Sequence, residues 1–170
     1  MTPRMTHCIV VMGVSGAGKS TVGMLIAERL GLGFRDADEF HPPANIAKMS
    51  AGQPLADADR WPWLDAIGAH LVSHRGHGCI VTCSALKRAY RERLRNAAPG
   101  LRFIHLHGDL ALVAARQAAR QGHFMPASLV ASQFATLEAP SDEPDVVALD
   151  VAAAPAALAD AAIRALGGGG

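Results

Sequence analysis

The sequence predicts an α/β fold: three α/β/α layers around a five-stranded parallel sheet, with a helical lid. Apolar runs of strand length alternate five times with segments of helical periodicity. The first run, residues 7–12, is apolar at nearly every position, as in a strand that both faces of a parallel sheet bury. A glycine-rich turn follows it directly. Such strand–helix alternation favours right-handed crossovers with helices on both faces of the sheet.

The first half of the chain contains two of the expected strands. The expected elements are a strand at 7–12, a helix at 19–30, a strand at 34–36 and helices at 41–49 and 57–74. Val22, Ile26 and Leu30 share one face of the first helix, which indicates that this helix packs on the sheet. Pro42 and Pro43 are compatible with the first turn of the short helix.

The second half of the chain supplies the other three strands. The expected elements are a strand at 79–83, a helix at 86–96, a strand at 101–106, helices at 110–120 and 127–137, a strand at 146–151 and a helix at 155–166. Gly78 precedes the first of these strands, and Pro99–Gly100 turns the chain into the next. No internal repeat or low-complexity linker divides the chain, so we expect one domain, residues 1–170.

Composition excludes several classes of function. The formal net charge is +1, which argues against a nucleic-acid or anionic-membrane partner. Cys8, Cys79 and Cys83 are an odd number in a chain of this length, so we interpret them as small apolar strand residues, not a disulfide framework or a zinc site. No apolar run reaches the roughly 20 residues of a membrane span. A soluble, cytoplasmic protein is expected.

Residues 13–20 match the complete phosphate-loop motif G-x-x-x-x-G-K-[ST]. Its glycines allow backbone N–H groups to approach phosphate oxygens, next to a helix N-terminus that favours anions. We predict that Lys19 acts catalytically on the β- and γ-phosphates of ATP and that the Ser20 hydroxyl ligates Mg²⁺. The predicted nucleotide contacts are Gly13, Val14, Ser15, Gly16, Ala17, Gly18, Lys19, Ser20 and Thr21. The alternative is a chance glycine turn, which the buried strand before it and the helix after it disfavour.

Other segments indicate a small-molecule kinase. The chain lacks the Asn-Lys-x-Asp sequence with which GTPases read guanine. Asp36 and Asp38 end the second strand, and residues two apart in an extended segment face the same side. We predict that Asp36 orients Mg²⁺ through water and that Asp38 accepts the proton of the acceptor hydroxyl. A solvated turn rich in Asp is the alternative.

Basic residues downstream provide candidates for a lid and for the acceptor. Arg116 and Arg120 share a helix face before the break at 122–126, so a lid over about 116–128 could close on the phosphates, with Arg120 acting catalytically. Two solvated helix arginines are the alternative. The candidate acceptor-binding residues are Asp38, His41, Lys48, Arg60, Ser84, Lys87, Arg91 and His123.

The chain resembles the small P-loop gluconokinases, the thermoresistant gluconokinase family, whose fold is related to shikimate and nucleoside monophosphate kinases. The matching segments include Met12–Ser20, Asp36–Asp38, His41–Pro42, Asn45–Met49, Gly52–Leu55, Asp57, Asp59–Arg60, Pro62–Leu64, Cys83–Lys87, Tyr90–Arg91, Leu106–Asp109, Arg116, Arg120, Gly122–Phe124, Gln133–Phe134 and Thr136–Glu138. Small departures occur at Ala37 and at Pro43–Ala44, and about the last thirty residues match weakly.

The resemblance implies ATP-dependent phosphorylation of D-gluconate at its 6-hydroxyl, with Mg²⁺, an acceptor-binding helical segment at about 39–64, and a homodimer. Two alternatives remain open. One is another small-molecule kinase, acting on shikimate or a different sugar acid. The other is a nucleotide-binding regulatory module that has no acceptor.

Overall fold

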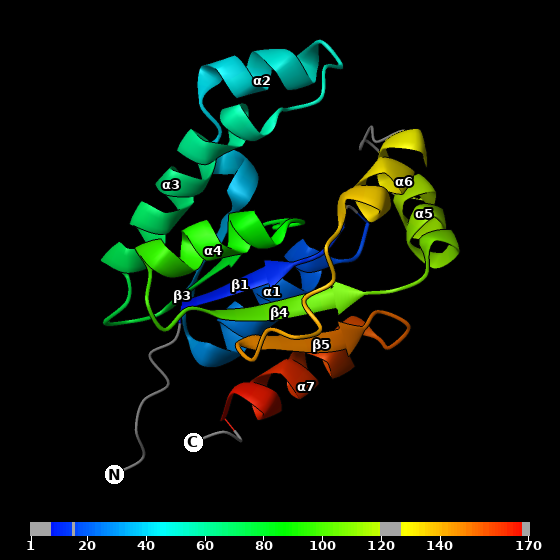
Figure 1. Cartoon of the computed structure of the whole chain (residues 1–170). Coiled ribbons are helices and arrows are strands. Elements are labelled where there is room, and N and C mark those ends of the chain that lie inside the picture. The colour runs from blue at the N-terminus through cyan, green and yellow to red at the C-terminus, as the bar shows by residue number, and fades with distance from the viewer. Residues whose placement is uncertain (1–7, 15, 120–126, 168–170) are drawn as a thin grey trace.

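All five expected strands join one parallel sheet. The computed structural model describes residues 8–14, 16–119 and 127–167 of the chain. The strands are β1 (Cys8–Met12), β2 (Gly33–Asp36), β3 (Cys79–Thr82), β4 (Arg102–His107) and β5 (Val146–Asp150). Their order is β2-β3-β1-β4-β5, and every neighbouring pair is parallel (Figure 1). The prediction of a parallel α/β sheet is therefore confirmed.

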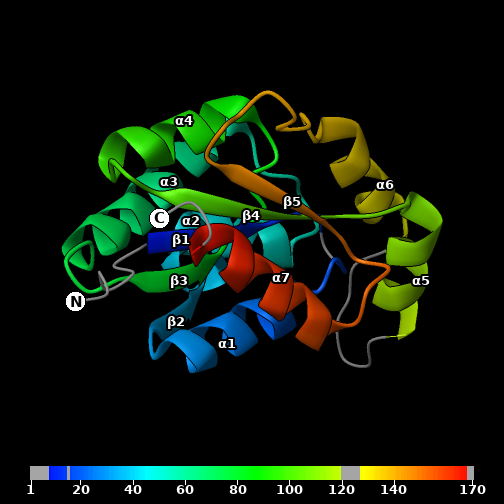
Figure 2. The same cartoon turned by 90° about the horizontal axis from the view of Figure 1, so that it is seen from below.

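Helices cover both faces of the sheet. They are α1 (Lys19–Leu30), α2 (Pro43–Ser50), α3 (Asp57–Ser73), α4 (Arg88–Ala97), α5 (Leu110–Ala119), α6 (Ala127–Thr136) and α7 (Pro155–Gly167). α3 and α4 pack together on one face, and α1 and α7 pack together on the other (Figures 1 and 2). Across the described part of the chain, no helix is both long and apolar enough to cross a bilayer.

The central strand divides its side chains between two apolar cores. Cys8, Val10 and Met12 face the layer of α3 and α4, whereas Ile9 and Val11 face α1 and α7. All five are almost inaccessible to solvent. Alternating strand side chains point to opposite faces, so an entirely apolar β1 is what a strand covered on both sides requires.

Two local details differ from the expected elements. A short 3₁₀ helix, η1 (Ala37–Phe40), follows β2. It was missed because four residues are too few to show a helical period. The helix expected to begin at residue 86 begins instead at Arg88. Ala85 has a φ of 46°, a left-handed conformation that keeps the preceding loop out of the helix.

Candidate active site

The phosphate loop joins the carboxyl end of β1 to the N-terminus of α1. Gly13 has a φ of 150°, and a Cβ there would lie 2.6 Å from the carbonyl oxygen of Leu106. Gly18 is the N-cap of α1 with a φ of 90°. Backbone of this shape needs glycine, and it points the N-terminus of α1 toward the loop, where a helix end favours an anion. Val14, Gly16 and Ala17 are buried within the loop, and Thr21 is exposed in the first turn of α1, whereas Ser15 lies outside the described residues.

Lys19 and Ser20 lie together at the start of α1. The Lys19 ammonium group donates to the carbonyl oxygens of Gly13 at 2.9 Å and Val14 at 3.1 Å. The charge therefore lies over the loop that phosphate would occupy. The Ser20 hydroxyl donates to Asp36 Oδ2 at 3.3 Å. This contact brings together the two residues that the sequence predicts at the metal.

Both predicted carboxylates border the same cleft, but not through strand alternation. Asp36 caps η1: its Oδ1 accepts from the Asp38 backbone N–H at 2.9 Å, and Glu39 Oε2 accepts from the Asp36 N–H at 2.8 Å. Asp38 thus belongs to a 3₁₀ turn, and its side chain is 87% exposed. The cap orients Asp36 toward Ser20 and leaves the Asp38 carboxylate accessible to an acceptor.

His41 is a buried, neutral hydrogen-bond donor beside Asp38. Its ring stacks on Trp63 with centroids 4.4 Å apart and an interplanar angle of 8°. Asn45 Nδ2 donates to His41 Nδ1 at 3.2 Å, so the ring proton is on Nε2, which lies 3.9 Å from Asp38 Oδ1. Burial and, second, the charge of Arg60 lower the pKa of His41 to about 4. His41 therefore offers an N–H at neutral pH without adding charge.

One cleft of about 510 Å³ joins these groups. From the phosphate side it is lined by Gly16, Gly18, Lys19 and Ser20, and from the acceptor side by Asp36, Ala37, Asp38, His41, Arg60, Trp63 and Ser84. The cleft is also lined by Gly52–Leu55, from the predicted acceptor-binding segment, and by Ser132, Gln133 and Thr136 on α6, which were not predicted as site residues. For Gln133 and Thr136 the signal existed, because both lie in segments that match the gluconokinases.

Arg60 is a partly buried cation on the wall of the cleft, and its Nε atom is fully buried. Its Nε has no hydrogen-bond partner among the described residues, and its guanidinium lies 5.4 Å from the centre of the Tyr90 ring. One terminal nitrogen donates to the Leu55 carbonyl at 3.4 Å. A buried donor without a partner is costly, so Arg60 retains capacity for an anionic ligand.

Lys48 and Lys87 have carboxylate partners from the first turn of α3. Lys48 Nζ lies 2.7 Å from Asp59 Oδ2, and Lys87 Nζ lies 3.2 Å from Asp57 Oδ1. Neither lysine is among the described residues that line the cleft. Both pairs hold the helix end that carries Arg60, and the acidic first turn suits the positive end of the helix dipole. In this conformation the structure does not bring the two lysines to the acceptor.

Arg91 is fully buried and is not among the described cleft residues. Its guanidinium pairs with Glu143, with the shortest contact at 2.7 Å, and donates to the carbonyls of Ala85, Leu86 and Glu138 at 2.7, 3.2 and 2.8 Å. The structure thus does not bring Arg91 to the cleft, where the sequence suggested an acceptor contact. It instead fixes the loop that presents Ser84 to the cleft.

The predicted lid, residues 116–128, is described only at its two ends. Arg116 on α5 donates to the carbonyl oxygen of Val151 at 2.6 Å, which ties α5 to the end of β5. Arg120, His123 and the rest of 120–126 lie outside the described residues. The lid therefore stays a prediction.

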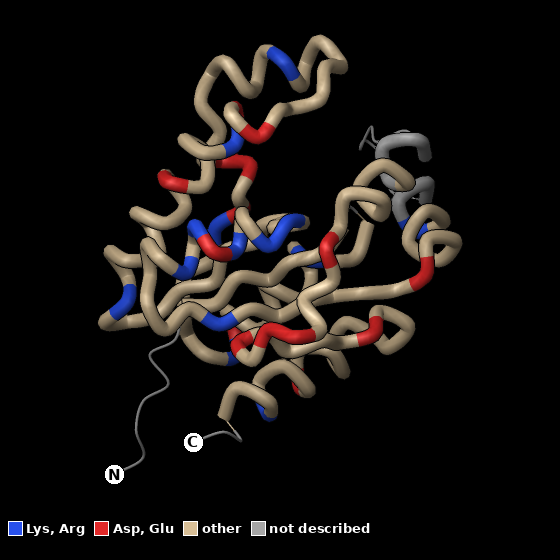
Figure 3. Tube along the Cα trace, viewed as in Figure 1, with Lys and Arg blue, Asp and Glu red and all other residues tan. Residues whose placement is uncertain are grey.

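Charges on the described surface alternate in sign. Figure 3 shows acidic residues interspersed with the basic ones around α3 and α4. Many are paired, as for Arg93 with Asp65 and Arg88 with Asp142. This distribution agrees with the interpretation that the cations serve a small ligand or local pairs, not a polyanion.

Comparisons with known proteins agree on one family. A family model described as an AAA domain matches residues 8–144. The gluconokinase of Gluconobacter oxydans is 52% identical over 141 residues, covering 82% of this chain and 79% of the relative. The thermoresistant gluconokinase of Escherichia coli is 44% identical over 148 residues, covering 85% of each chain.

Solved structures resemble the fold throughout the chain. A gluconokinase from Sinorhizobium meliloti aligns with a TM-score of 0.89 and 52% identity, covering 96% of this chain and 93% of that one. A shikimate kinase from Aquifex aeolicus aligns with a TM-score of 0.63 and 16% identity, covering 95% and 96%. The second likeness concerns the fold alone, and it bears out the predicted relation to shikimate kinases.

Proposed function

The chain belongs to the AAA domain family and to the gluconokinases, and on that premise we propose that it transfers the γ-phosphoryl group of ATP to the 6-hydroxyl of D-gluconate. The products are ADP and 6-phospho-D-gluconate. The observation that carries the proposal is the single cleft that holds the phosphate loop, Asp38, His41 and Arg60 together. A nucleotide-binding module without an acceptor has no need of the second half of this cleft.

The donor half suits a triphosphate. The backbone N–H groups of 13–18 and the N-terminus of α1 bind its oxygens, and the Lys19 ammonium exchanges its loop carbonyls for the β- and γ-phosphates. We include Ser15, Thr21, Arg116 and Arg120 among the expected nucleotide contacts.

The acceptor half suits a hydroxylated acid. The Arg60 guanidinium binds the carboxylate of gluconate, because its Nε is a buried donor in need of an acceptor. His41 Nε2–H and the Ser84 hydroxyl bind hydroxyl groups along the carbon chain. The role of His123 in this half rests on the family resemblance.

The exposed Asp38 carboxylate receives the acceptor proton. The 6-hydroxyl oxygen forms a bond to the γ-phosphorus as the bond to the bridging oxygen of ADP breaks, and the hydroxyl proton passes to Asp38. Because the transition state of such transfers is loose, positioning by His41 and Arg60 and neutralisation by Lys19 contribute more than base strength.

Ser20 and Asp36 fit a magnesium ion. Their oxygens lie 3.3 Å apart beside the phosphate loop, and hydroxyl and carboxylate oxygens are the donors that Mg²⁺ prefers. When bound with ATP, this ion neutralises charge on the phosphate oxygens. Ser20 would hold it directly and Asp36 through water.

Three wider expectations belong to the same proposal. They are a single kinase domain over 1–170 with a lid at about 116–128 and an acceptor-binding segment at about 39–64, a homodimeric assembly, and a cytoplasmic location. The family resemblance supports the lid and the dimer, and the use of cellular ATP supports the location.

A coupled ADP-release assay across acceptors tests the proposal. The purified chain with ATP and Mg²⁺ is offered gluconate, other sugar acids, shikimate or no acceptor. We expect the highest kcat/KM with gluconate and only background release without an acceptor. A preference for shikimate or another sugar acid would show that gluconate is not the acceptor. ADP release that does not depend on any acceptor would contradict kinase function altogether.

A further inference from the structure

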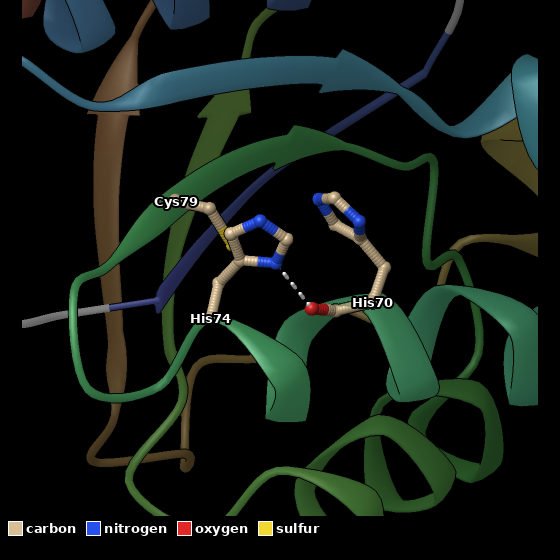
Figure 4. A group of neighbouring side chains, drawn as sticks. All are labelled: His70, His74 and Cys79. Atoms are coloured by element: carbon tan, nitrogen blue, oxygen red, sulfur yellow. Dashed lines mark hydrogen bonds between the residues drawn. The ribbon is translucent and has the colours of Figure 1, made fainter.

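Three metal-binding side chains gather at the amino end of the sheet, at the opposite end of β3 from the cleft. His70 lies in the last turn of α3, His74 caps that helix, and Cys79 is the first residue of β3. One ligand atom from each lies within 4.8 Å of the other two. Figure 4 shows both rings side by side between the end of α3 and β3, next to Cys79. The kinase reaction uses none of these residues.

Local structure explains why they meet. Residues four apart share a helix face, so the His70 and His74 rings lie next to each other, with centroids 4.3 Å apart and planes tilted by 39°. The chain then reverses tightly, with the Gly78 N–H donating to the His74 carbonyl at 2.6 Å. This turn brings Cys79 back to the two histidine rings at the end of α3. A linear search for paired Cys and His spacings does not detect the arrangement.

His74 is already held in the form that binds a metal. Its Nδ1–H donates to the His70 carbonyl at 2.9 Å, and the Ser73 hydroxyl donates to the same carbonyl at 2.7 Å. The proton on Nδ1 leaves the Nε2 lone pair available. An outer hydrogen bond of this kind, from the second ring nitrogen to a backbone carbonyl, is usual for histidines that ligate metals.

We propose that His70, His74 and Cys79 form a binding site for a divalent transition metal of the zinc type. Two imidazoles and a thiolate are the ligands that Zn²⁺ and Co²⁺ prefer, in tetrahedral geometry. Bonds of about 2.0–2.3 Å put tetrahedral ligands roughly 3.3–3.8 Å apart. The atoms here need to approach by about 1 Å. Reorientation of the partly exposed His70 ring provides this approach while His74 keeps its hydrogen bond. Water takes the fourth position.

The thiol at the site loses its proton when the metal binds. The Cys79 S–H now points to Cys8 Sγ at 3.8 Å, and the Cys8 S–H donates to the Leu71 carbonyl at 3.2 Å. A metal–sulfur bond to Cys79 replaces its S–H bond, and one proton per ion passes to solvent.

The bound ion would link the end of α3 to the start of β3. Because Thr82 and Cys83, at the other end of β3, are the residues that reach the cleft, the ion stabilises the fold without entering the reaction. Mg²⁺ does not substitute for it, since that ion prefers oxygen ligands.

Cobalt provides a direct spectroscopic test, because a cobalt–thiolate bond has a charge-transfer band in the near ultraviolet. The full chain, chelator-treated and reduced with a phosphine, is titrated with Co²⁺. We expect a saturable band with one equivalent. His70→Ala/His74→Ala removes two of the three protein ligands and should weaken binding by more than about 100-fold, since losing even an outer-shell partner costs about 10- to 100-fold in known sites. Cys79→Ser should abolish the band.

Two variants control the assignment. His77→Ala removes an exposed histidine of the same turn and should leave the band and the affinity unchanged. Cys8→Ser should keep the band, since Cys79 supplies the sulfur. No band in the native chain, a band that survives Cys79→Ser, or equal losses in His77→Ala and the double variant would overturn the proposal.

Thermal unfolding provides a readout that does not depend on the thiolate band. With Zn²⁺ at about 100 times its dissociation constant, the Tm of the native chain should rise by roughly 5–10 °C. The His70→Ala/His74→Ala variant should show no such rise, and Mg²⁺ should not reproduce it. An equal zinc-induced rise in that variant would contradict the site.

Discussion

Arg60 differs from the other cations of the acceptor segment in what surrounds it. Lys48 and Lys87 each have a carboxylate at salt-bridge distance, whereas Arg60 lines the cleft with a buried Nε that has no partner among the described residues. A guanidinium in that position suits a planar carboxylate better than an ammonium group does. We therefore propose that Arg60 binds the acid group of the acceptor.

Replacing Arg60 should weaken the binding of the acceptor more than the binding of ATP. Arg60→Met keeps a long apolar stem and removes the charge, and we expect the KM for gluconate to rise by about 10- to 100-fold. A rise of this size corresponds to losing one hydrogen bond to a charged group, which contributes about 1.5–3 kcal/mol to binding. Steady-state kinetics with each substrate varied in turn checks this.

Lys48→Met is the matched control for Arg60→Met, because it removes a cation from the same region that pairs with Asp59. Its effect on the KM for gluconate should be several-fold smaller. An unchanged KM for gluconate in Arg60→Met, or equal rises in both variants, would contradict the proposed contact between Arg60 and the gluconate carboxylate.

At the scale of elements, a buried ionic cluster connects α4 to the segment before β5. Arg91 and Arg95 on α4 both contact Glu143, whose side chain is 3% exposed. Burial alone would raise the pKa of Glu143, but hydrogen bonds and charge from the two arginines lower it to about 2. The same Arg91 binds the carbonyls of Ala85 and Leu86, so the cluster also holds the Ser84 loop.

Breaking this cluster should destabilise the fold. Glu143→Gln leaves Arg91 buried without its counter-ion, and we expect a loss of about 3–5 kcal/mol in the free energy of unfolding, measured in urea. Asp65→Asn is the matched control, since it breaks an exposed pair with Arg93 and should cost about 0.2–1 kcal/mol. Similar losses in the two variants would contradict a special role for Glu143.

The pH dependence of stability provides a second measure of the same cluster. The pKa of Glu143 is lower in the folded chain than in the unfolded one, so its contribution is complete above about pH 4.5 and disappears as the pH falls toward 2. Native protein should lose stability over that range more steeply than Glu143→Gln. Parallel curves for the two proteins would count against the assignment.

At the scale of the whole molecule, the sequence predicts what depends on local pattern. The five strands and Gly13–Ser20 were predicted because apolar runs and a loop motif are encoded by neighbours in the chain. The exposed Asp38 was also predicted at the cleft, although a 3₁₀ turn and not strand alternation takes it there.

The roles that depend on distant partners could not be predicted in the same way. Arg91 was a candidate for binding the acceptor, and its burial against Glu143 was not predicted because Glu143 lies 52 positions away in the chain. The pairs of Lys48 with Asp59 and of Lys87 with Asp57 were not predicted either, because nothing in the local sequence shows them. Burial and pairing of this kind exist only after the layers have packed.

The structure of the reaction product tests the central claim most directly. The chain is incubated with ATP, Mg²⁺ and D-gluconate, and the products are examined by ³¹P NMR with coupling to the sugar protons. We expect ADP together with one new phosphomonoester on the C6 oxygen, and no such product from Lys19→Ala, in which the phosphate-binding charge is absent. A phosphate on another hydroxyl, no phosphorylated acid at all, or native yields from a folded Lys19→Ala would contradict it.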